Sequence, residues 1–377
     1  MPHDFMPGLA GVPAATSSIS DVDGERGILE YRGIRVETLC SDSSYLETAY
    51  LLLFGHLPSK SEFQQWTEDV IHHRRIKFRI IDLLKDLPET GHPMDALQAA
   101  VAALGMFYPG RNVKDVENNY WSAVRLVAKL PTIVAAWARL RHGDDPIPPR
   151  DDLGFSENFL YMLTESFTPP LWAQIFDDCL ILHAEHTMNA STFTGLVTAS
   201  TLADPYTVVA SSIGALKGPL HGGANEEVVM MLKEIGTTEN ARTYVERALQ
   251  NKKKLMGFGH RVYKVKDPRA TVLQELCRRL FKECGSSPLY NVAVEVERTA
   301  GESLNKKGIY PNVDFYSGII YDKMGIDVDL FTPLFAMARV SGWLAHWLEQ
   351  LRENKLFRPD QIYAGAHNRP YIPIDRR

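Results

Sequence analysis

Helical hydrophobic spacing runs through most of this chain from about Ile34 onward, and it limits the fold more than any other feature. Segments such as 95–107 and 171–186 are rich in alanine, leucine and methionine, which is typical of buried helices with several neighbours. Capping-box patterns that begin at Ser44 and Ser59 mark two helix starts. No run alternates long enough to indicate a central sheet, so the predicted fold class is mostly α.

Short corners that contain glycine or proline separate the helical segments. They lie at residues 54–58, 91–93, 108–110, 129–131 and 143–149. The first 34 residues differ, because the segments 15–20 and 27–34 favour strands and the stretch from Asp21 to Gly24 has the composition of a turn. We expect a small strand pair there.

The chain has 377 residues, more than one simple core usually accommodates, so we expect two domains. Its net charge of −5 argues against a general nucleic-acid binder. No apolar run is long enough to span a membrane, and the N-terminus lacks the layout of a secretion signal. The four cysteines, Cys40, Cys179, Cys277 and Cys284, lack metal-ligand spacing. We therefore expect reduced thiols and a cytoplasmic location.

Three motifs combine a histidine or an aspartate with turn residues. They are GPLHGGANEE at 218–227, GFGHRVYKVKDPRA at 257–270 and PNVDFYSG at 311–318. Two imidazoles and one carboxylate of this kind are the parts of an acid–base site. The candidate residues are His221, His260 and Asp314.

His221 precedes a predicted helix start, where the positive end of the helix dipole disfavours protonation of the ring. A neutral imidazole there can donate a hydrogen bond to an enolate oxygen, and the alternative is a histidine that only caps the turn. Asp314 has two interpretations as well. It could be a helix N-cap, or a base whose basicity rises because Phe315 and Tyr316 limit its solvation.

A basic run extends from Lys252 to Arg269 and is interrupted by the glycines of the second motif. Backbone N–H groups beside cations suit a loop that cradles phosphates. In an acidic chain, so compact a patch favours a small polyanion over DNA or RNA.

His183 and His186 are three residues apart and would be neighbours on one helix face. Contact with an anionic substrate, a structural role and a metal site are the open interpretations. A metal would need a third ligand that the nearby sequence does not offer, so no metal is predicted.

The three motifs, in this order and spacing, resemble the signature of the citrate synthase family. The resemblance extends through LHAEHTMNAST, STLADPY, LFTPLFAMARVSGWLAHW and RPDQIYAG, and it covers nearly the whole chain from about Gly8. It implies a large and a small helical domain that close over the site in an obligate homodimer, with a minor β element at the N-terminus. The large domain would comprise residues 1–223 and 323–377, and the small mobile domain residues 224–322.

The resemblance also implies roles for individual residues. Asp314 would take a proton from the methyl group of acetyl-CoA, His221 would hydrogen-bond the thioester oxygen, and His260 would polarise the oxaloacetate carbonyl. The residues that would bind oxaloacetate are His186, Arg269, Arg339 and Arg358, the last acting in the partner subunit's site. Those that would bind CoA are Lys254, Met256, Gly257, Phe258, Gly259, Lys307 and Asn312.

The implied reaction condenses acetyl-CoA, oxaloacetate and water to citrate and CoA, the entry step of the tricarboxylic acid cycle. Acetyl-CoA would be a cosubstrate, and no permanently bound cofactor is expected. We expect no NADH site, because the chain starts too close to the common core to hold the longer N-terminal region of NADH-regulated members. Two alternatives stay open: a 2-methylcitrate synthase that uses propionyl-CoA, and a helical assembly scaffold without activity.

Overall fold

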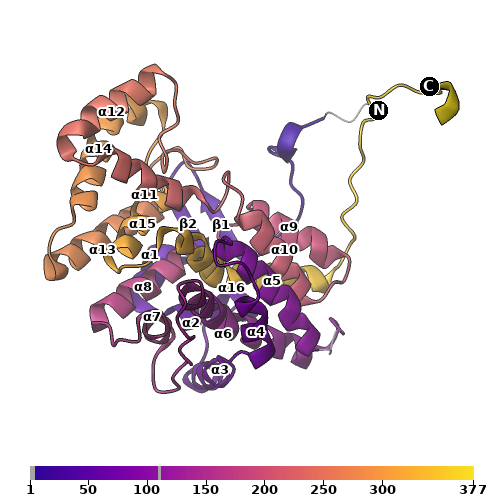
Figure 1. Cartoon of the computed structure of the whole chain (residues 1–377), viewed down its shortest axis with the longest axis horizontal. Coiled ribbons are helices and arrows are strands. Elements are labelled where there is room, and N and C mark those ends of the chain that lie inside the picture. Colours follow the sequence, from indigo (N-terminus) through magenta and orange to yellow (C-terminus); the bar gives the residue numbers. More distant parts are fainter. Residues whose placement is uncertain (1–4, 109–111) are drawn as a thin grey trace.

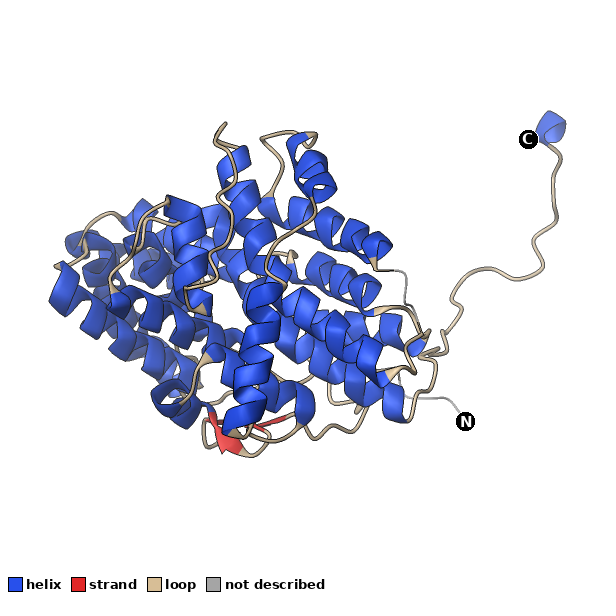
Figure 2. Ribbon diagram, turned by 90° about the horizontal axis from the view of Figure 1, so that it is seen from below, coloured by secondary structure: helices blue, strands red, loops and turns tan. Residues whose placement is uncertain are grey.

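The computed structural model describes residues 5–108 and 112–377. Helices make up most of the described part of the chain, which confirms the predicted fold class (Figures 1 and 2). The first eight are α1 (Val36–Asp42), α2 (Tyr45–Phe54), α3 (Lys60–His72), α4 (Phe78–Lys85), α5 (Pro93–Leu104), α6 (Val116–Leu140), α7 (Phe155–Thr164) and α8 (Pro170–His183). The others are α9 (Ala190–Ser200), α10 (Pro205–Leu216), α11 (Ala224–Ile235), α12 (Thr238–Gln250), α13 (Pro268–Cys284), α14 (Pro288–Leu304), α15 (Val313–Lys323) and α16 (Phe331–Arg352).

The N-terminal β element is an antiparallel sheet in the order β1 (Ser20–Asp23), β2 (Ile28–Tyr31) and β3 (Ile34–Arg35). Ser20 lies opposite Tyr31 across the first pair. The existence of a strand pair is confirmed, but the predicted first strand (15–20) and the predicted turn are both wrong in position, because only Ser20 of the first segment belongs to β1. Residues 21–23 continue β1 because they pair with β2, and the chain turns only from Gly24 onward.

Helix α16 forms the centre of the larger group of helices. It packs against α2, α6, α8, α9 and α10, and its residues from Phe331 to Trp347 are all buried. A helix that is buried on every side needs apolar or small residues all round, and the sequence of α16 supplies them. Arg339 and His346 are polar exceptions in this buried stretch.

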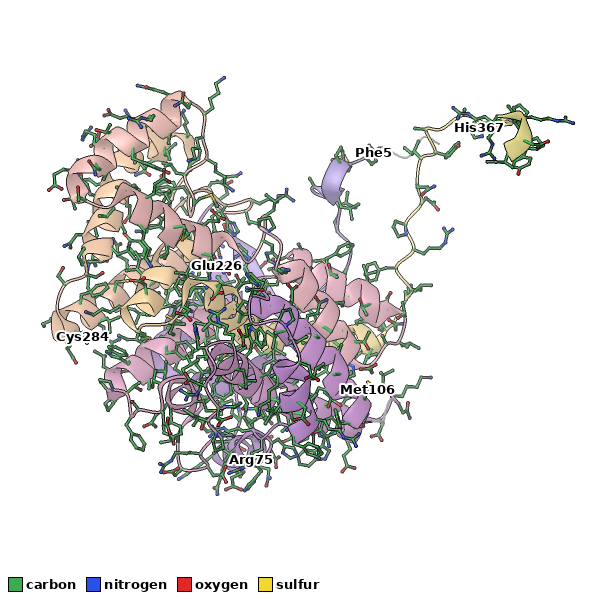
Figure 3. The ribbon with its side chains drawn as sticks, viewed as in Figure 1. Phe5, Arg75, Met106, Glu226, Cys284 and His367 are labelled. Carbon is green, nitrogen blue, oxygen red and sulfur yellow. The ribbon has the colours of Figure 1, made fainter. Side chains whose placement is uncertain are left out.

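Helices α11 to α15 gather at one side of the molecule (Figure 1). Within this group α12 packs on α14, α13 packs on α15, and α11 packs on both α14 and α15. Contacts of α13 with α1 and α8, and of α11 with α16, join the group to the rest. The Thr332 hydroxyl at the start of α16 donates to the carboxylate of Glu226 on α11. Glu226 is labelled in Figure 3.

Most of the helix starts and ends that were predicted from capping residues, glycine and proline are confirmed. Ser59 forms the reciprocal capping box with Glu62, Ser44 accepts from the N–H of Glu47, and Gly55 ends α2 in the left-handed conformation. The segment 95–107 is helical, whereas α8 ends at His183 and so stops short of the predicted 186. The predicted corner at 108–110 lies partly outside the described residues.

The predicted corner at 129–131 is wrong. Pro131 lies inside α6, in a stretch that is buried from Ser122 to Ala138 apart from one residue. A proline removes one helical hydrogen bond, and the burial of so many neighbours offsets that loss. The corner at 143–149 is a loop, as predicted.

The four cysteines are free thiols, three of them buried and Cys284 partly exposed, which agrees with the expectation. In the ranges that the structure covers, none of the helices combines the length and apolar character that crossing a membrane requires.

Candidate active site

The His221 ring lies just before α11, and hydrogen bonds fix its orientation. Its Nε2 accepts from the Ser191 N–H at 3.3 Å and lies 2.9 Å from Ser191 Oγ, which itself accepts from the indole N–H of Trp343 at 3.1 Å. Burial, and then the nearby charge of Arg339, lower the pKa of His221 to about 4. The ring is therefore neutral at pH 7. Nε2 also lies 3.2 Å from Asn189 Oδ1, and we place the proton on Nδ1 because the Ser191 backbone N–H can only donate to Nε2.

His260 is oriented by its own loop. Its Nδ1 accepts from the N–H groups of Val262 at 3.1 Å and Tyr263 at 3.4 Å, so the ring carries its proton on Nε2. Burial, and then Arg269, lower the pKa of His260 to about 4. This ring is a second neutral donor at pH 7.

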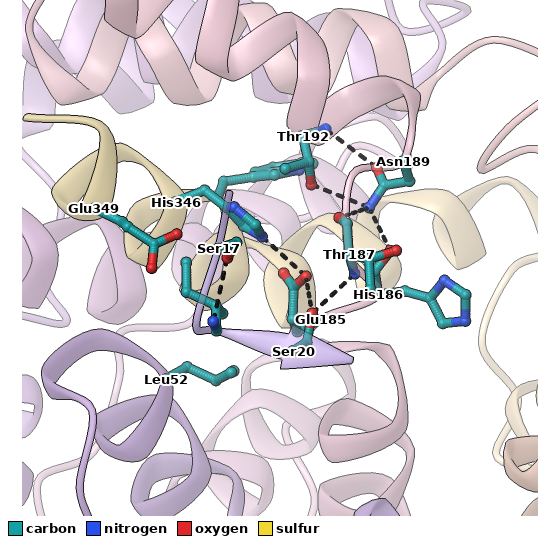
Figure 4. A network of polar contacts seen from close by, with 12 residues as sticks. Ser17, Ser20, Leu52, Glu185, His186, Thr187, Asn189, Thr192, His346 and Glu349 are labelled. Carbon is teal, nitrogen blue, oxygen red and sulfur yellow. Dashed lines mark hydrogen bonds and ion pairs between the residues drawn. The ribbon is translucent and has the colours of Figure 1, made fainter. Parts of the chain in front are cut away.

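His186 faces His260 across a centroid distance of 5.0 Å, and its Nε2 lies 3.2 Å from the hydroxyl of Tyr263. In Figure 4 the His186 ring points away from the hydrogen-bonded network of its neighbours Glu185 and Thr187. Burial, and then Arg269, hold the pKa of His186 well below its ordinary value. His186 is thus buried, neutral and turned toward the same loop as His260.

The helical pairing of His183 with His186 is wrong, because α8 ends at His183. The His183 ring instead lies with Nδ1 at 2.7 Å from the Cys179 carbonyl one turn earlier. His183 therefore belongs to α8, whereas His186 follows the end of the helix and contacts Tyr263 and His260. The described residues contain no group of three ligands that could hold a metal ion.

Asp314 lies in the first turn of α15, and the N-cap interpretation is wrong. The cap is Asn312, whose side-chain oxygen accepts from the Asp314 N–H at 3.0 Å. Burial raises the pKa of Asp314 to about 7, against the lowering effect of Arg269 and Arg339. Because Asn312 provides the cap, the Asp314 carboxyl group does not cap the helix and can take part in proton transfer. Its pKa is suited to a general base near neutral pH.

Two buried arginines supply positive charge to this cluster. Arg269 is 2% exposed and pairs with the buried Asp267, at 2.8 Å and 3.1 Å. Arg339 is 1% exposed, donates from Nε to the His183 carbonyl at 2.7 Å, and lies over the Phe335 ring. One terminal nitrogen of Arg339 has no partner among the described residues. A buried, partly unsatisfied guanidinium is suited to bind a carboxylate.

Comparisons with known proteins agree on one family. The family domain described as "Citrate synthase, C-terminal domain" matches residues 8–360. A citrate synthase of Synechocystis sp. is 60% identical over 373 residues, which cover 99% of this chain and 94% of that protein.

The chain belongs to the citrate synthase family.

Solved structures of this family have the same fold. The crystal structure of citrate synthase from Pyrobaculum aerophilum matches with a TM-score of 0.93 at 44% identity, over 99% of this chain and 95% of that one. The ternary complex of carboxymethyl coenzyme A and oxaloacetate with citrate synthase from Thermoplasma acidophilum matches with a TM-score of 0.92 at 32% identity. That match covers 98% of this chain and 99% of the other. The predicted citrate synthase fold is thereby confirmed.

The segment 256–259, which includes Met256 and Phe258, lies directly against the motif of Asn312. Gly259 N–H donates to the Tyr310 carbonyl at 2.8 Å, and Asn312 donates to the carbonyls of Gly257 at 2.8 Å and Gly259 at 3.0 Å. Gly257 has a φ of +75°, and a side chain there would meet Val228 and Phe315. Three hydrogen bonds therefore join the two motifs into one unit.

Lys254 and Lys307 are exposed near this unit and have no ion pair within the described ranges. Lys254 is close enough to Asp314 to lower its pKa. Arg358, in contrast, forms an ion pair with Asp360, at 3.6 Å, and none with the residues of the cluster that the structure describes. Its side chain is 79% exposed, and it begins the C-terminal segment that leaves the body of the molecule (Figure 1).

Several residues of the cluster were not predicted from the sequence. Asp267 could have been found, because an aspartate before a proline is a helix-start signal, and it caps α13 as well as pairing with Arg269. Tyr263, Ser191 and Glu185 carry no local signal of this kind. Tyr263 contacts His186 and Ser191 contacts His221, each far away in the sequence. The carboxylate of Glu185 contacts Ser20 and His346.

Proposed function

We propose that this chain condenses acetyl-CoA with oxaloacetate and water to give citrate and CoA. One observation carries the proposal: two neutral histidines and a carboxyl group with a pKa of about 7 lie around two buried arginines. Proton abstraction from a carbon acid needs this combination of a base, oriented N–H donors and fixed cations.

In the first step the Asp314 carboxylate takes a proton from the methyl group of acetyl-CoA. The Nδ1–H of His221 donates to the thioester oxygen and stabilises the enol or enolate. The new carbanion attacks the oxaloacetate carbonyl, whose oxygen accepts a hydrogen bond from the Nε2–H of His260. The alkoxide that forms takes up one proton, which balances the proton that Asp314 removed from the methyl group. Water then cleaves the citryl thioester, which releases citrate and the CoA thiol.

Oxaloacetate binds through His186, Arg269 and Arg339, because two carboxylates need fixed cations in a buried site. Arg358 completes the site in a homodimer, reaching it from the partner subunit. Its exposure on a segment that leaves the body supports this role. CoA binds along Met256, Gly257, Phe258, Gly259 and Asn312, with Lys254 and Lys307 near its phosphates.

Residues 224–322 act as a mobile domain that closes over the bound substrates and excludes water. The packing of α11 to α15 on one another supports this division. Small-angle scattering with and without oxaloacetate plus a CoA analogue tests it, since closure would reduce the radius of gyration. The four free thiols favour a reducing compartment such as the cytoplasm.

The test of the reaction is thiol release from acetyl-CoA or propionyl-CoA, each with and without oxaloacetate. We expect rapid release with acetyl-CoA that depends on oxaloacetate. A preference for propionyl-CoA would assign the chain to 2-methylcitrate synthesis with the same site. Absence of release with both thioesters would contradict the proposal and favour a scaffold.

A further inference from the structure

The hairpin of β1 and β2 contacts the segment that carries His186. Ser20 and Tyr31 are direct cross-strand partners, and both side chains reach this segment. The Ser20 hydroxyl donates to the Glu185 carboxylate at 2.9 Å and accepts from the Thr187 N–H at 3.1 Å (Figure 4). The Tyr31 hydroxyl donates to the Glu185 carbonyl at 2.8 Å. The hairpin thus holds the residues on both sides of His186.

The held segment has an unfavourable backbone conformation. Thr187 has a φ of +50°, in the left-handed region that β-branched residues rarely adopt. The Glu185 carboxylate is fully buried, and its second contact is His346 Nε2 at 3.0 Å. Such a conformation persists only where its surroundings impose it, so the contacts of Ser20 and Glu185 are the means of keeping His186 in place.

The turn of the same hairpin contacts the loop that carries His260. The Gly24 carbonyl accepts from the Lys264 N–H at 2.9 Å. A side chain at Gly24 would overlap the backbone carbonyl of Val262, and one at Gly27 would come within 2.8 Å of Val265. Glycine in the turn therefore permits an approach between backbones that no other residue would allow.

This second contact bears on His260 directly, because the N–H groups of Val262 and Tyr263 are the donors that orient its ring. The Tyr263 hydroxyl in turn lies 3.2 Å from His186 Nε2. One hairpin therefore supports both histidines, although they belong to segments far apart in the chain.

We propose that the β1–β2 hairpin is a positioning element for oxaloacetate binding. Its strands fix the segment of His186, its turn fixes the loop of His260, and together they set the distance between the two rings. The hairpin does not touch the reacting atoms. This inference rests on the proposed function, because it assigns oxaloacetate to these two histidines.

The test uses the full-length protein and compares Gly24→Ala and Ser20→Ala with the wild type. Calorimetry gives the dissociation constant for oxaloacetate, and steady-state kinetics give KM for oxaloacetate and acetyl-CoA separately. We expect Gly24→Ala to weaken oxaloacetate binding about tenfold or more and Ser20→Ala several-fold. The reason is that a displacement of about 1 Å in a binding group strongly reduces its contribution to affinity. KM for acetyl-CoA should change less than twofold. Ser20→Thr, which keeps the hydroxyl, should restore binding.

Gly33→Ala is the matched control. Gly33 lies in the turn between β2 and β3, has a φ of +81°, and has open space where a side chain would be added. This substitution strains the same sheet without touching the loop of His260, so it should lower the thermal midpoint while oxaloacetate binding stays unchanged.

The outcomes separate the two claims. Unchanged oxaloacetate binding in both Gly24→Ala and Ser20→Ala, or an equal loss in Gly33→Ala, would overturn the role of the hairpin while leaving the proposed function intact. A wild-type protein that neither binds oxaloacetate nor releases thiol would overturn both. If Gly24→Ala does not fold, the comparison of Ser20→Ala with Ser20→Thr decides.

Discussion

The two ends of the proposed site are built in opposite ways. At the oxaloacetate end, Arg269 and Arg339 are buried almost completely and oriented by hydrogen bonds to protein groups. At the CoA end, Lys254 and Lys307 are exposed beside a glycine loop. Buried guanidinium groups give geometry and specificity, whereas exposed ammonium groups attract an anion over a distance and are screened by salt. The difference predicts which substitutions will be severe.

The largest effect should come from Asp314→Asn, which keeps the shape of the group between the two ends and removes the base. We expect kcat to fall about 10³-fold or more, because a positioned general base contributes about 10²- to 10⁴-fold. Thiol release under saturating substrates measures it. Activity near the wild-type level would mean that another group takes the proton.

The same variant should gain stability at pH 8, because the wild-type carboxylate is ionised in an environment that raises its pKa to about 7. The gain in the free energy of unfolding should reach about 4 kcal/mol, since the pKa rises from 3.8 to about 7 and each pKa unit corresponds to about 1.4 kcal/mol. It should disappear below about pH 4, where the carboxyl group is protonated in both folded and unfolded chains. Urea unfolding at the two pH values tests this sign.

Arg339→Lys should raise KM for oxaloacetate about 100-fold and leave KM for acetyl-CoA nearly unchanged, because lysine cannot bind a carboxylate bidentately. Arg74→Lys is the matched control. Arg74 is also buried, at 2% exposure, but it donates to the carbonyls of Arg150 and Leu153 far from the cluster. The Arg74→Lys substitution should lower the stability of the protein without changing KM for oxaloacetate or for acetyl-CoA. Equal KM effects in the two variants would contradict a binding role for Arg339.

The dependence of kcat on pH should show the ionisation of Asp314, with a smaller change in kcat near neutral pH than the Asp314→Asn substitution causes. Since Asp314 must be ionised to act, kcat should rise through a pKa of about 7 and fall about tenfold for each pH unit below it. His221 and His260, with pKa values of about 4, should add no titration between pH 6 and 8. A flat profile from pH 5 to 8 would argue against Asp314 as the base.

The smallest effect should come from the CoA end. Lys254→Ala and Lys307→Ala should each raise KM for acetyl-CoA about two- to fivefold, because exposed ion pairs contribute about 0.2–1 kcal/mol. Lys282→Ala, an exposed lysine on α13, is the control and should change nothing. A loss as large as that of Arg339→Lys would mean that the lysines become buried around the substrate.

The helical class and the candidate residues His221, His260 and Asp314 could be predicted from the sequence. These features depend on residues that are close together in the chain. Helical spacing, capping residues and glycine-flanked histidines can all be recognised within short windows. The two interpretations of Asp314 could not be separated locally, since Asn312 two residues earlier offers an equally good cap. The structure distinguishes the two interpretations, because it shows which side chain caps the first turn of α15.

The failures share one cause, which is that distant contacts decided the outcome. Pro131 remains within α6 because packing from other helices compensates for the broken hydrogen bond. The end of α8 at His183 depends on Tyr31 and Ser20, which bind the segment that follows it. The contact between Gly24 and the loop of His260 joins the beginning of the chain to its last third. A single sequence carries no local signal for such pairs.

The most direct test of the contrast between the two ends is the salt dependence of both KM values in the wild-type protein. Between about 0.05 and about 0.5 M potassium chloride, KM for acetyl-CoA should rise at least about threefold, because exposed charges are screened over this range. KM for oxaloacetate should rise much less, since its cations are buried. A stronger salt dependence for oxaloacetate than for acetyl-CoA would contradict the assignment of the buried arginines to one substrate and the exposed lysines to the other.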